Sequence, residues 1–173
     1  MYKEKKNSWK LNYLAYAMYF ITGVVCMQVG SNMSGLIELY QKPVETIALI
    51  TSAFAAGRTL SVSIIGKLSE RKDPLKILLI GTIFVLLYLL GIIIPAYDLA
   101  LLFAFLGGIG MSCQDVLCPI LLSNVNAKNY SSALSAGQAL FGLGGFSISL
   151  LTGYMFRMGK PFYYSNLILS FAG

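Results

Sequence analysis

The sequence predicts an all-α membrane protein, a bundle of six spanning helices of which the sixth is cut short. Hydrophobic residues make up 57% of the 173 residues and charged residues only 12%, against about 25% charged in an average soluble domain. Residues 77–94 carry no charge over 18 positions, which is enough to cross a bilayer as a helix. Such a chain lacks the polar surface to cover itself in water, so lipid is its expected surrounding.

The first predicted span, 12–36, follows a basic N-terminal segment. A basic start before an apolar run is also typical of a signal peptide. This run is longer than the apolar core of most signal peptides, however, and no small-residue cleavage pattern follows it cleanly. We therefore expect a retained helix, joined by the breaker "YQKPVE" to a second span at 45–66.

The third predicted span, 76–94, is apolar all round and follows the charged loop "SERKDP". Thr82 and Tyr88 are its polar residues, so it has no face to offer water and should lie at the lipid-exposed periphery. The first, second, fourth and fifth spans contain Gln, Asn, Ser, Asp, Arg and Gly. We expect those four to form the interior.

The fourth and fifth predicted spans, 99–122 and 132–155, are bounded by "PAYD", "SNVNAKNYSS" and "RMGKP". The sixth, 162–173, has only 12 residues. These give about 18 Å of helix, too little for a hydrocarbon core of about 30 Å. We therefore expect residues 1–173 to be a single bundle from a fragment or a truncated product.

The basic residues predict the orientation in the membrane. With the N-terminus inside, nine of the 13 basic residues are cytoplasmic: Lys3, Lys5, Lys6, Lys10, Lys67, Arg71, Lys72, Lys76 and Lys128. Three lie outside, namely Lys42, Arg157 and Lys160. This bias toward the inside predicts a multi-pass protein of the cytoplasmic membrane with a cytoplasmic N-terminus.

Several classes of function are disfavoured by composition. The chain has no histidine, which removes the commonest metal ligand and general base. Its three cysteines fall in apolar runs and are expected to pack rather than form disulfides. The net charge of +6 is explained by orientation, so we expect no nucleic-acid partner. No enzyme activity, cofactor or metal site is expected.

Arg58 and Asp115 are the sharpest candidates for function, because charges within spans are costly and are usually paired or functional. Arg58 lies nine residues before Lys67 and Asp115 eight before Ser123. Both therefore lie about 12–14 Å from the same membrane face, so an ion pair is geometrically possible. A permanent structural salt bridge and a proton- or solute-binding site remain equal alternatives.

Polar amides mark the other candidates for a solute or ion pathway. Gln28 and Asn32 are one turn apart on the first span and share a face, and Gln114 lies beside Asp115. Helix packing and a water-filled cavity are both open for these amides. Gln138 belongs to a polar and small stripe on the fifth span, Ser131, Ser135, Gln138, Gly142, Gly145 and Ser149. We expect packing to explain its glycines.

Residues 66–74, "GKLSERKDP", join the second and third spans and resemble the signature loop of the major facilitator superfamily. The matching residues are Gly66, Leu68, Ser69, Glu70 and Arg71. Asp73 and Pro74 depart from it, since the family prefers a glycine and a basic residue there. The resemblance covers the whole chain as an N-terminal six-helix half.

"GGIGMSCQDVLCPILL" and "SSALSAGQALFGLGGFSISLLTG" are similar to the fucose–proton symporter branch of that superfamily. The resemblance implies secondary active transport of a small solute, a sugar or another compound, by two bundles that rock about a central cavity, with proton coupling. It also implies a cytoplasmic gate at Gly66, Leu68, Glu70 and Arg71, in which Glu70 meets a helix terminus of the missing C-terminal half.

Two other classes of membrane protein are alternatives to a transporter half. The substrate-binding membrane subunit of an energy-coupling-factor importer also has about six spans in a chain of this length, and would bind its solute without ion coupling. A membrane-embedded enzyme is disfavoured because no paired intramembrane carboxylates, Ser/Lys or Cys/His arrangement is present.

Overall fold

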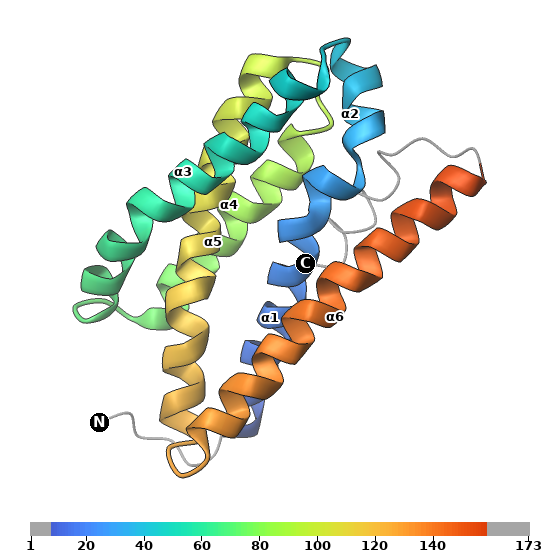
Figure 1. Ribbon diagram of the computed structural model, residues 1–173. Coiled ribbons are helices and arrows are strands. Elements are labelled where there is room, and N and C mark those ends of the chain that lie inside the picture. Colours follow the sequence, from blue (N-terminus) through green and yellow to red (C-terminus); the bar gives the residue numbers. More distant parts are fainter. Residues whose placement is uncertain (1–7, 159–173) are drawn as a thin grey trace.

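The computed structural model describes residues 8–158, and these fold as a bundle of helices (Figure 1). The helices are α1 (Ser8–Ser31), α2 (Met33–Tyr40), α3 (Val44–Ser69), α4 (Pro74–Gly91), α5 (Tyr97–Val125) and α6 (Tyr130–Arg157). All but α2 are long and apolar enough to cross a membrane. The predicted all-α membrane fold is confirmed, while residues 162–173, the sixth predicted span, lie outside the described residues.

The first predicted span is broken near its end. Residues 12–36 were expected to form one helix, but α1 ends at Ser31 and α2 begins at Met33. Asn32 between them has φ −108° and ψ 15°, and its side-chain Nδ2 donates to the Gln28 carbonyl at 2.9 Å. The Asn32 amide also donates to the Gln28 carbonyl at 3.2 Å, and the Leu36 amide donates to the Asn32 carbonyl at 3.0 Å. The interruption is therefore a local change of backbone dihedral angles, of the kind that a side chain bonded back to the preceding turn produces, and not a loss of helix hydrogen bonds.

The loop between α3 and α4 explains the two departures from the family motif. Asp73 is the N-cap of α4, and its Oδ1 accepts a hydrogen bond from the Leu75 amide at 3.0 Å. Pro74 is the first helical residue, where its missing N–H costs nothing. An N-cap aspartate followed by proline therefore starts α4 at once and keeps this loop short.

Helix α5 is the centre of the bundle, and it packs against α3, α4 and α1 (Figure 1). Helix α1 in turn packs against α6. Glycines bring the backbones together: a Cβ at Gly57 of α3 would overlap the Phe105 carbonyl of α5, and a Cβ at Gly144 of α6 would overlap the Phe20 carbonyl of α1. These contacts follow the small-residue packing that is typical of membrane helices.

The structure corrects the predicted division into interior and periphery. Helix α4 does lie at an edge, with exposed side chains such as Leu79, Ile83 and Leu90. Helices α3 and α6, expected to be interior, are less buried than α4. Their polar residues lie largely on exposed faces, for instance Thr59 and Gln138, because polarity in a span marks a face unsuited to lipid and does not say what covers it.

Buried apolar side chains form two clusters with polar residues between them. One cluster includes Val29, Leu36, Ile50, Tyr88 and Ala104, and the other includes Ala15, Ile65, Leu78, Leu117 and Leu122. Between the clusters, α1, α3 and α5 contribute Thr22, Arg58, Ser61, Ser112, Gln114 and Asp115, here named the polar belt. The belt positions the candidate site.

Candidate functional site

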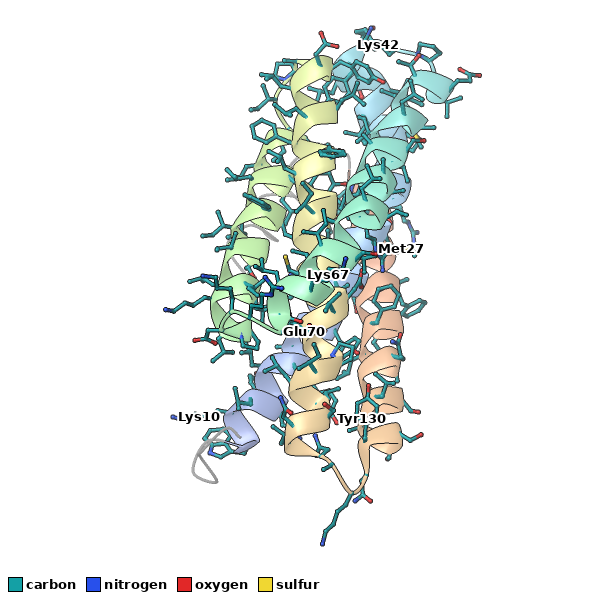
Figure 2. All side chains as sticks on the ribbon, turned by 90° about the vertical axis from the view of Figure 1, so that its left-hand side faces the viewer. Lys10, Met27, Lys42, Lys67, Glu70 and Tyr130 are labelled. Carbon is teal, nitrogen blue, oxygen red and sulfur yellow. The ribbon has the colours of Figure 1, made fainter. Side chains whose placement is uncertain are left out.

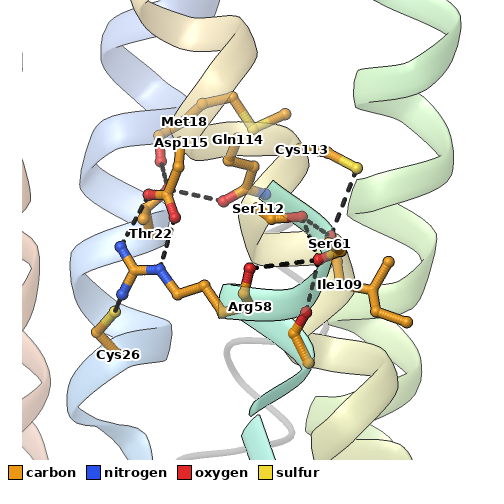
Figure 3. Close-up of polar contacts among 11 residues, drawn as sticks. Met18, Thr22, Cys26, Arg58, Ser61, Ile109, Ser112, Cys113, Gln114 and Asp115 are labelled. Atoms are coloured by element: carbon orange, nitrogen blue, oxygen red, sulfur yellow. Dashed lines mark hydrogen bonds and ion pairs between the residues drawn. The ribbon is translucent and has the colours of Figure 1, made fainter. Parts of the chain in front are cut away.

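Arg58 and Asp115 form an ion pair that joins α3 to α5 (Figure 3). Arg58 Nε donates to Asp115 Oδ2 at 2.6 Å and Arg58 Nη2 donates to Oδ1 at 2.9 Å. Two parallel bonds of this kind are the strongest arrangement of a guanidinium and a carboxylate. The pairing that the matched depths made possible is therefore present in the structure.

The third nitrogen of the guanidinium points to the first helix. Arg58 Nη1 lies 3.8 Å from Cys26 Sγ of α1, a weak contact because a thiol is a poor acceptor. Cys26 is partly exposed, whereas Cys113 and Cys118 are buried. The expectation that cysteines only pack thus holds for two of the three, and the ion pair lies where α1, α3 and α5 meet.

The rest of the polar belt ties the same three helices together. Ser61 of α3 and Ser112 of α5 lie 2.7 Å apart through their hydroxyl oxygens, in a buried position. Thr22 Oγ1 of α1 lies 2.6 Å from Gln114 Oε1 of α5 and 2.6 Å from the Met18 carbonyl oxygen. Two helix-to-helix hydrogen bonds therefore flank the ion pair.

Close backbone contact places Arg58 beside α5. A Cβ at Gly108 of α5 would overlap the Phe54 carbonyl and crowd the Arg58 amide of α3. Because neither Gly57, next to Arg58, nor Gly108, about two turns before Asp115, has a side chain, the two backbones touch close to the ion pair. Arg58 binds Asp115 through Nε and Nη2 and directs Nη1 toward Cys26 of α1.

The ion pair is isolated from the other charged residues of the described spans, yet it is not sealed. In the spanning helices as described, every other charged residue lies within two residues of a helix end. The Arg58 side chain is 39% exposed and that of Asp115 is 26% exposed. The pair therefore opens to the surface of the bundle that residues 8–158 form.

The predicted amides on α1 are buried beyond the belt. Gln28 is 1% exposed, and neither atom of its side-chain amide has a hydrogen-bond partner. Asn32, also buried, marks the break between α1 and α2. Gln114 has one partner, Thr22, and an unpaired Nε2. The structure thus brings Gln114 beside the ion pair and leaves Gln28 and Asn32 one to three turns away along α1.

Gln138 is the predicted candidate that the structure separates from the others. It lies exposed on α6 and makes no hydrogen bond to the described residues. Of the glycines in its stripe, Gly145 packs against α1, whereas a Cβ at Gly142 would meet open space. Packing within residues 8–158 therefore explains Gly145 and not Gly142, for which packing stays a prediction.

A groove of about 420 Å³ lies on another side of the bundle, between α1, α4, α5 and α6. Its lining is mostly aliphatic and aromatic, including Phe20, Val85 and Leu89, and its polar groups include those of Thr82 and Gln114. Neither Arg58 nor Asp115 lines it. Gln114, next to Asp115 in the sequence, is the residue of the polar belt that lines the groove.

The predicted gate residues lie at the end of α3 (Figure 2). Gly66 is partly exposed and has open space where a Cβ would stand, while Leu68, Glu70 and Arg71 are exposed. Neither charged side chain has a hydrogen-bond or ion-pair partner among the described residues. The loop is therefore shaped by backbone bonds, such as Arg71 N to Leu68 O at 3.1 Å.

Sequence reasoning missed four residues around the pair, Thr22, Cys26, Ser61 and Ser112. Each lies close to the depth of Arg58 or Asp115 on its helix, which was the available signal. Hydroxyls and thiols are common in packed spans, so depth alone did not single them out. Among residues 8–158 no group of three acidic, Cys or His side chains could hold a metal ion.

Comparison with known proteins identifies the family. The model of the Major Facilitator Superfamily matches residues 13–173. The chain belongs to this superfamily. It is 28% identical over 166 residues to the uncharacterized MFS-type transporter YfkL of Bacillus subtilis (strain 168), covering 88% of this chain and 41% of that protein. It is 28% identical over 141 residues to the inner membrane transport protein YdiN of Escherichia coli (strain K12), covering 81% of this chain and 34% of that protein.

The superfamily assignment settles the class of protein. The chain spans less than half the length of the two curated relatives, and no solved structure matches it significantly. The superfamily prediction from residues 66–74 is confirmed, and the chain is a multi-pass membrane protein of a transporter family rather than an enzyme. The importer-subunit alternative is set aside on this ground.

Proposed function

We propose that this chain is the N-terminal bundle of a secondary transporter, which moves a small solute by alternating access together with a second bundle. The observation that carries the proposal is the Arg58–Asp115 pair, a partly exposed ion pair in the middle of the bundle. Membership of the superfamily supports the same function. The positive-inside bias supports a cytoplasmic N-terminus in a cytoplasmic membrane, and YdiN is described as an inner membrane protein.

Proton coupling is the proposed role of Asp115. In the charged form it holds Arg58 through two bonds, and in the protonated form it no longer neutralises the guanidinium. Breaking a buried pair by loss of one charge costs about 3–5 kcal/mol, less here because both side chains are partly exposed. Protonation and solute binding are thereby linked, since a bound solute can restore the lost contacts.

Gln28, Asn32, Gln114 and Gln138 complete the proposed pathway. An unpaired buried amide costs about 1–3 kcal/mol, so the buried Gln28 amide is a costly residue if it only packs. The cost is offset if the amide meets solute or water at another stage of the cycle. Gln138 would reach the pathway only from α6, on the exposed face that a second bundle is expected to cover.

Glu70 and Arg71 are proposed to tie the cytoplasmic gate to the second bundle. Both side chains are exposed on the loop after α3. An acid at a helix N-terminus contributes about 0.3–1 kcal/mol, a bond weak enough to break in every cycle. Anchoring of the loop at the headgroups is compatible with the same residues.

The solute is proposed to be a sugar or another small compound, on the similarity of α5 and α6 to fucose–proton symporters. The full-length protein should be reconstituted in vesicles with an interior pH dye and challenged with a panel that includes fucose. Asp115→Asn should abolish solute-driven proton entry, whereas the matched control Asp98→Asn, exposed at the start of α5, should leave it intact. Wild-type proton entry in Asp115→Asn would remove Asp115 from the coupling.

A further inference from the structure

We propose that Arg58 is the binding point of a monovalent organic anion, a carboxylate, which replaces Asp115 on the guanidinium when Asp115 takes up a proton. The exchange step rests on the proposed function, while the anion site itself does not. The balance is simple: Asp115 gains the proton and becomes neutral, and the solute carboxylate takes its place beside the cation. The net charge of the site is zero before and after.

The isolation of the pair is the first argument. Away from the helix ends, the described spans contain one cation and one anion, Arg58 and Asp115. When Asp115 is neutral, the guanidinium is an uncompensated charge in an apolar bundle, which is strongly unfavourable. A neutral solute cannot offset that charge and a cationic solute would add to it. An anion is the class of solute that does offset it.

The number of charges on the solute follows from the same count. One guanidinium balances one negative charge. A second negative charge on the solute would be left without a partner among the described residues of the spans, at the cost of burying a lone charge. The site therefore favours a monoanion over a dianion such as a dicarboxylate or a phosphate monoester.

The geometry of the guanidinium gives the chemical type of the anion. Nε and Nη2 already hold a carboxylate, that of Asp115, through two parallel bonds of 2.6 and 2.9 Å. The edge that Asp115 vacates is thus shaped for another carboxylate. Nη1, whose contact is the Cys26 sulfur at 3.8 Å, adds a donor that no strong acceptor uses. The 39% exposure of the Arg58 side chain gives the solute access.

Cys26 provides a reporter in the native sequence. Its sulfur lies beside Nη1, Cys26 as a residue is partly exposed, and the other two cysteines of this chain are buried. An anion bound on Arg58 should therefore shield Cys26 from alkylation. The test uses the full-length protein in membranes, with N-ethylmaleimide as the reagent and mass spectrometry of the Cys26 peptide as the readout.

The probes are acetate, lactate, benzoate and gluconate, each compared with its neutral amide. At least one carboxylate should slow Cys26 alkylation more than its amide, and malonate should protect less than acetate. If no carboxylate protects more than its amide, the proposal is wrong.

Variants distinguish the loss of the Arg58 charge from a general loss of folding. Asp115→Asn leaves the guanidinium free, so protection should need about tenfold less carboxylate. The double variant Arg58→Gln with Asp115→Asn leaves no lone charge, should fold, and should lose carboxylate protection. Arg157→Gln removes an exposed cation at the end of α6 and should behave as the wild type. Carboxylate protection in the double variant would place the anion elsewhere and overturn the proposal.

Failure of this inference and failure of the proposed function give different results. Proton entry that depends on Asp115, but with neutral solutes alone, would keep the coupling and refute the anion. Carboxylate protection at Cys26 that depends on Arg58, together with wild-type proton entry in Asp115→Asn, would keep the anion site and refute the coupling role.

Discussion

The contact between α3 and α5 and the contact between α1 and α6 are built alike, except that only the first contains charges. In both, glycines allow backbone to meet backbone, Gly57 and Gly108 in one and Gly23 and Gly144 in the other. Each also has a serine pair. Only the α3–α5 contact adds an ion pair, Arg58 with Asp115. Because the α1–α6 contact manages without charges, charges are not needed to hold such helices together.

The difference between the two serine pairs also indicates that the α3–α5 contact does not need its ion pair for packing. Ser61 and Ser112 are 2.7 Å apart and buried, whereas Ser31 and Ser149 are 3.1 Å apart and exposed. The serine hydrogen bond of the α3–α5 contact is thus shorter and better buried than that of the α1–α6 contact, even before the ion pair is considered. The Arg58–Asp115 pair is not needed for helix packing and is partly exposed. It is therefore better suited to break and re-form during a transport cycle than to hold the helices together.

The largest expected effect on stability is the difference between removing one charge of the ion pair and removing both. Arg58→Ala should lower the free energy of unfolding by up to about 3 kcal/mol, at the low end for broken buried pairs because of the partial exposure. Arg58→Gln with Asp115→Asn should lower it by less than about 1 kcal/mol, since no lone charge remains. Thermal unfolding of the detergent-purified full-length protein measures both. Equal losses would mean that the pair itself holds α3 to α5.

An intermediate effect is expected at the glycines. Gly144→Ala should destabilise by about 1–3 kcal/mol because its Cβ would overlap the Phe20 carbonyl. The matched control is Gly142→Ala on the same helix, whose Cβ meets open space, and it should be neutral or slightly stabilising. The same unfolding assay compares them. Similar behaviour of the two variants would show that glycine contact does not hold α1 to α6.

The smallest expected effect compares the serine pairs. Ser61→Ala should cost about 1 kcal/mol, since it leaves the buried Ser112 hydroxyl with one partner fewer. Ser31→Ala removes an exposed bond and should change stability by less than about 0.5 kcal/mol. A larger loss for Ser31→Ala would reverse the ranking of the two contacts.

The helices and their order could be predicted because hydropathy and breakers act locally. Charge-free runs and segments such as "SERKDP" fix where spans begin and end, and lipid leaves few alternatives to a helix. Depth was also predictable, since rise per residue is constant, and it matched Arg58 with Asp115. Loop chemistry at Asp73 and Pro74 was readable too, although it was first treated only as a departure from a motif.

Neighbour relations between helices could not be predicted in the same way. Which helices touch, and how each is rotated about its axis, decides that Cys26 lies beside Arg58 and Thr22 beside Gln114. The break at Asn32 was missed because one side chain decides it through a local bond. The exposure of Gln138 was missed because a polar face can be covered by helices of the same bundle or by a partner.

The first span, divided at Asn32, serves two groups of neighbours. Its long portion, α1, lies with α5 and α6, whereas the short α2 is fastened elsewhere: Tyr40 donates to the Ile92 carbonyl at 2.7 Å and its ring meets that of Tyr97 edge-on. The two portions stay hydrogen-bonded to each other across Asn32, through Asn32 N to the Gln28 carbonyl at 3.2 Å and Leu36 N to the Asn32 carbonyl at 3.0 Å. One predicted span is therefore held by different neighbours at its two ends, and paired spin labels on Met27 and Ser34 would register any change of the angle between α1 and α2.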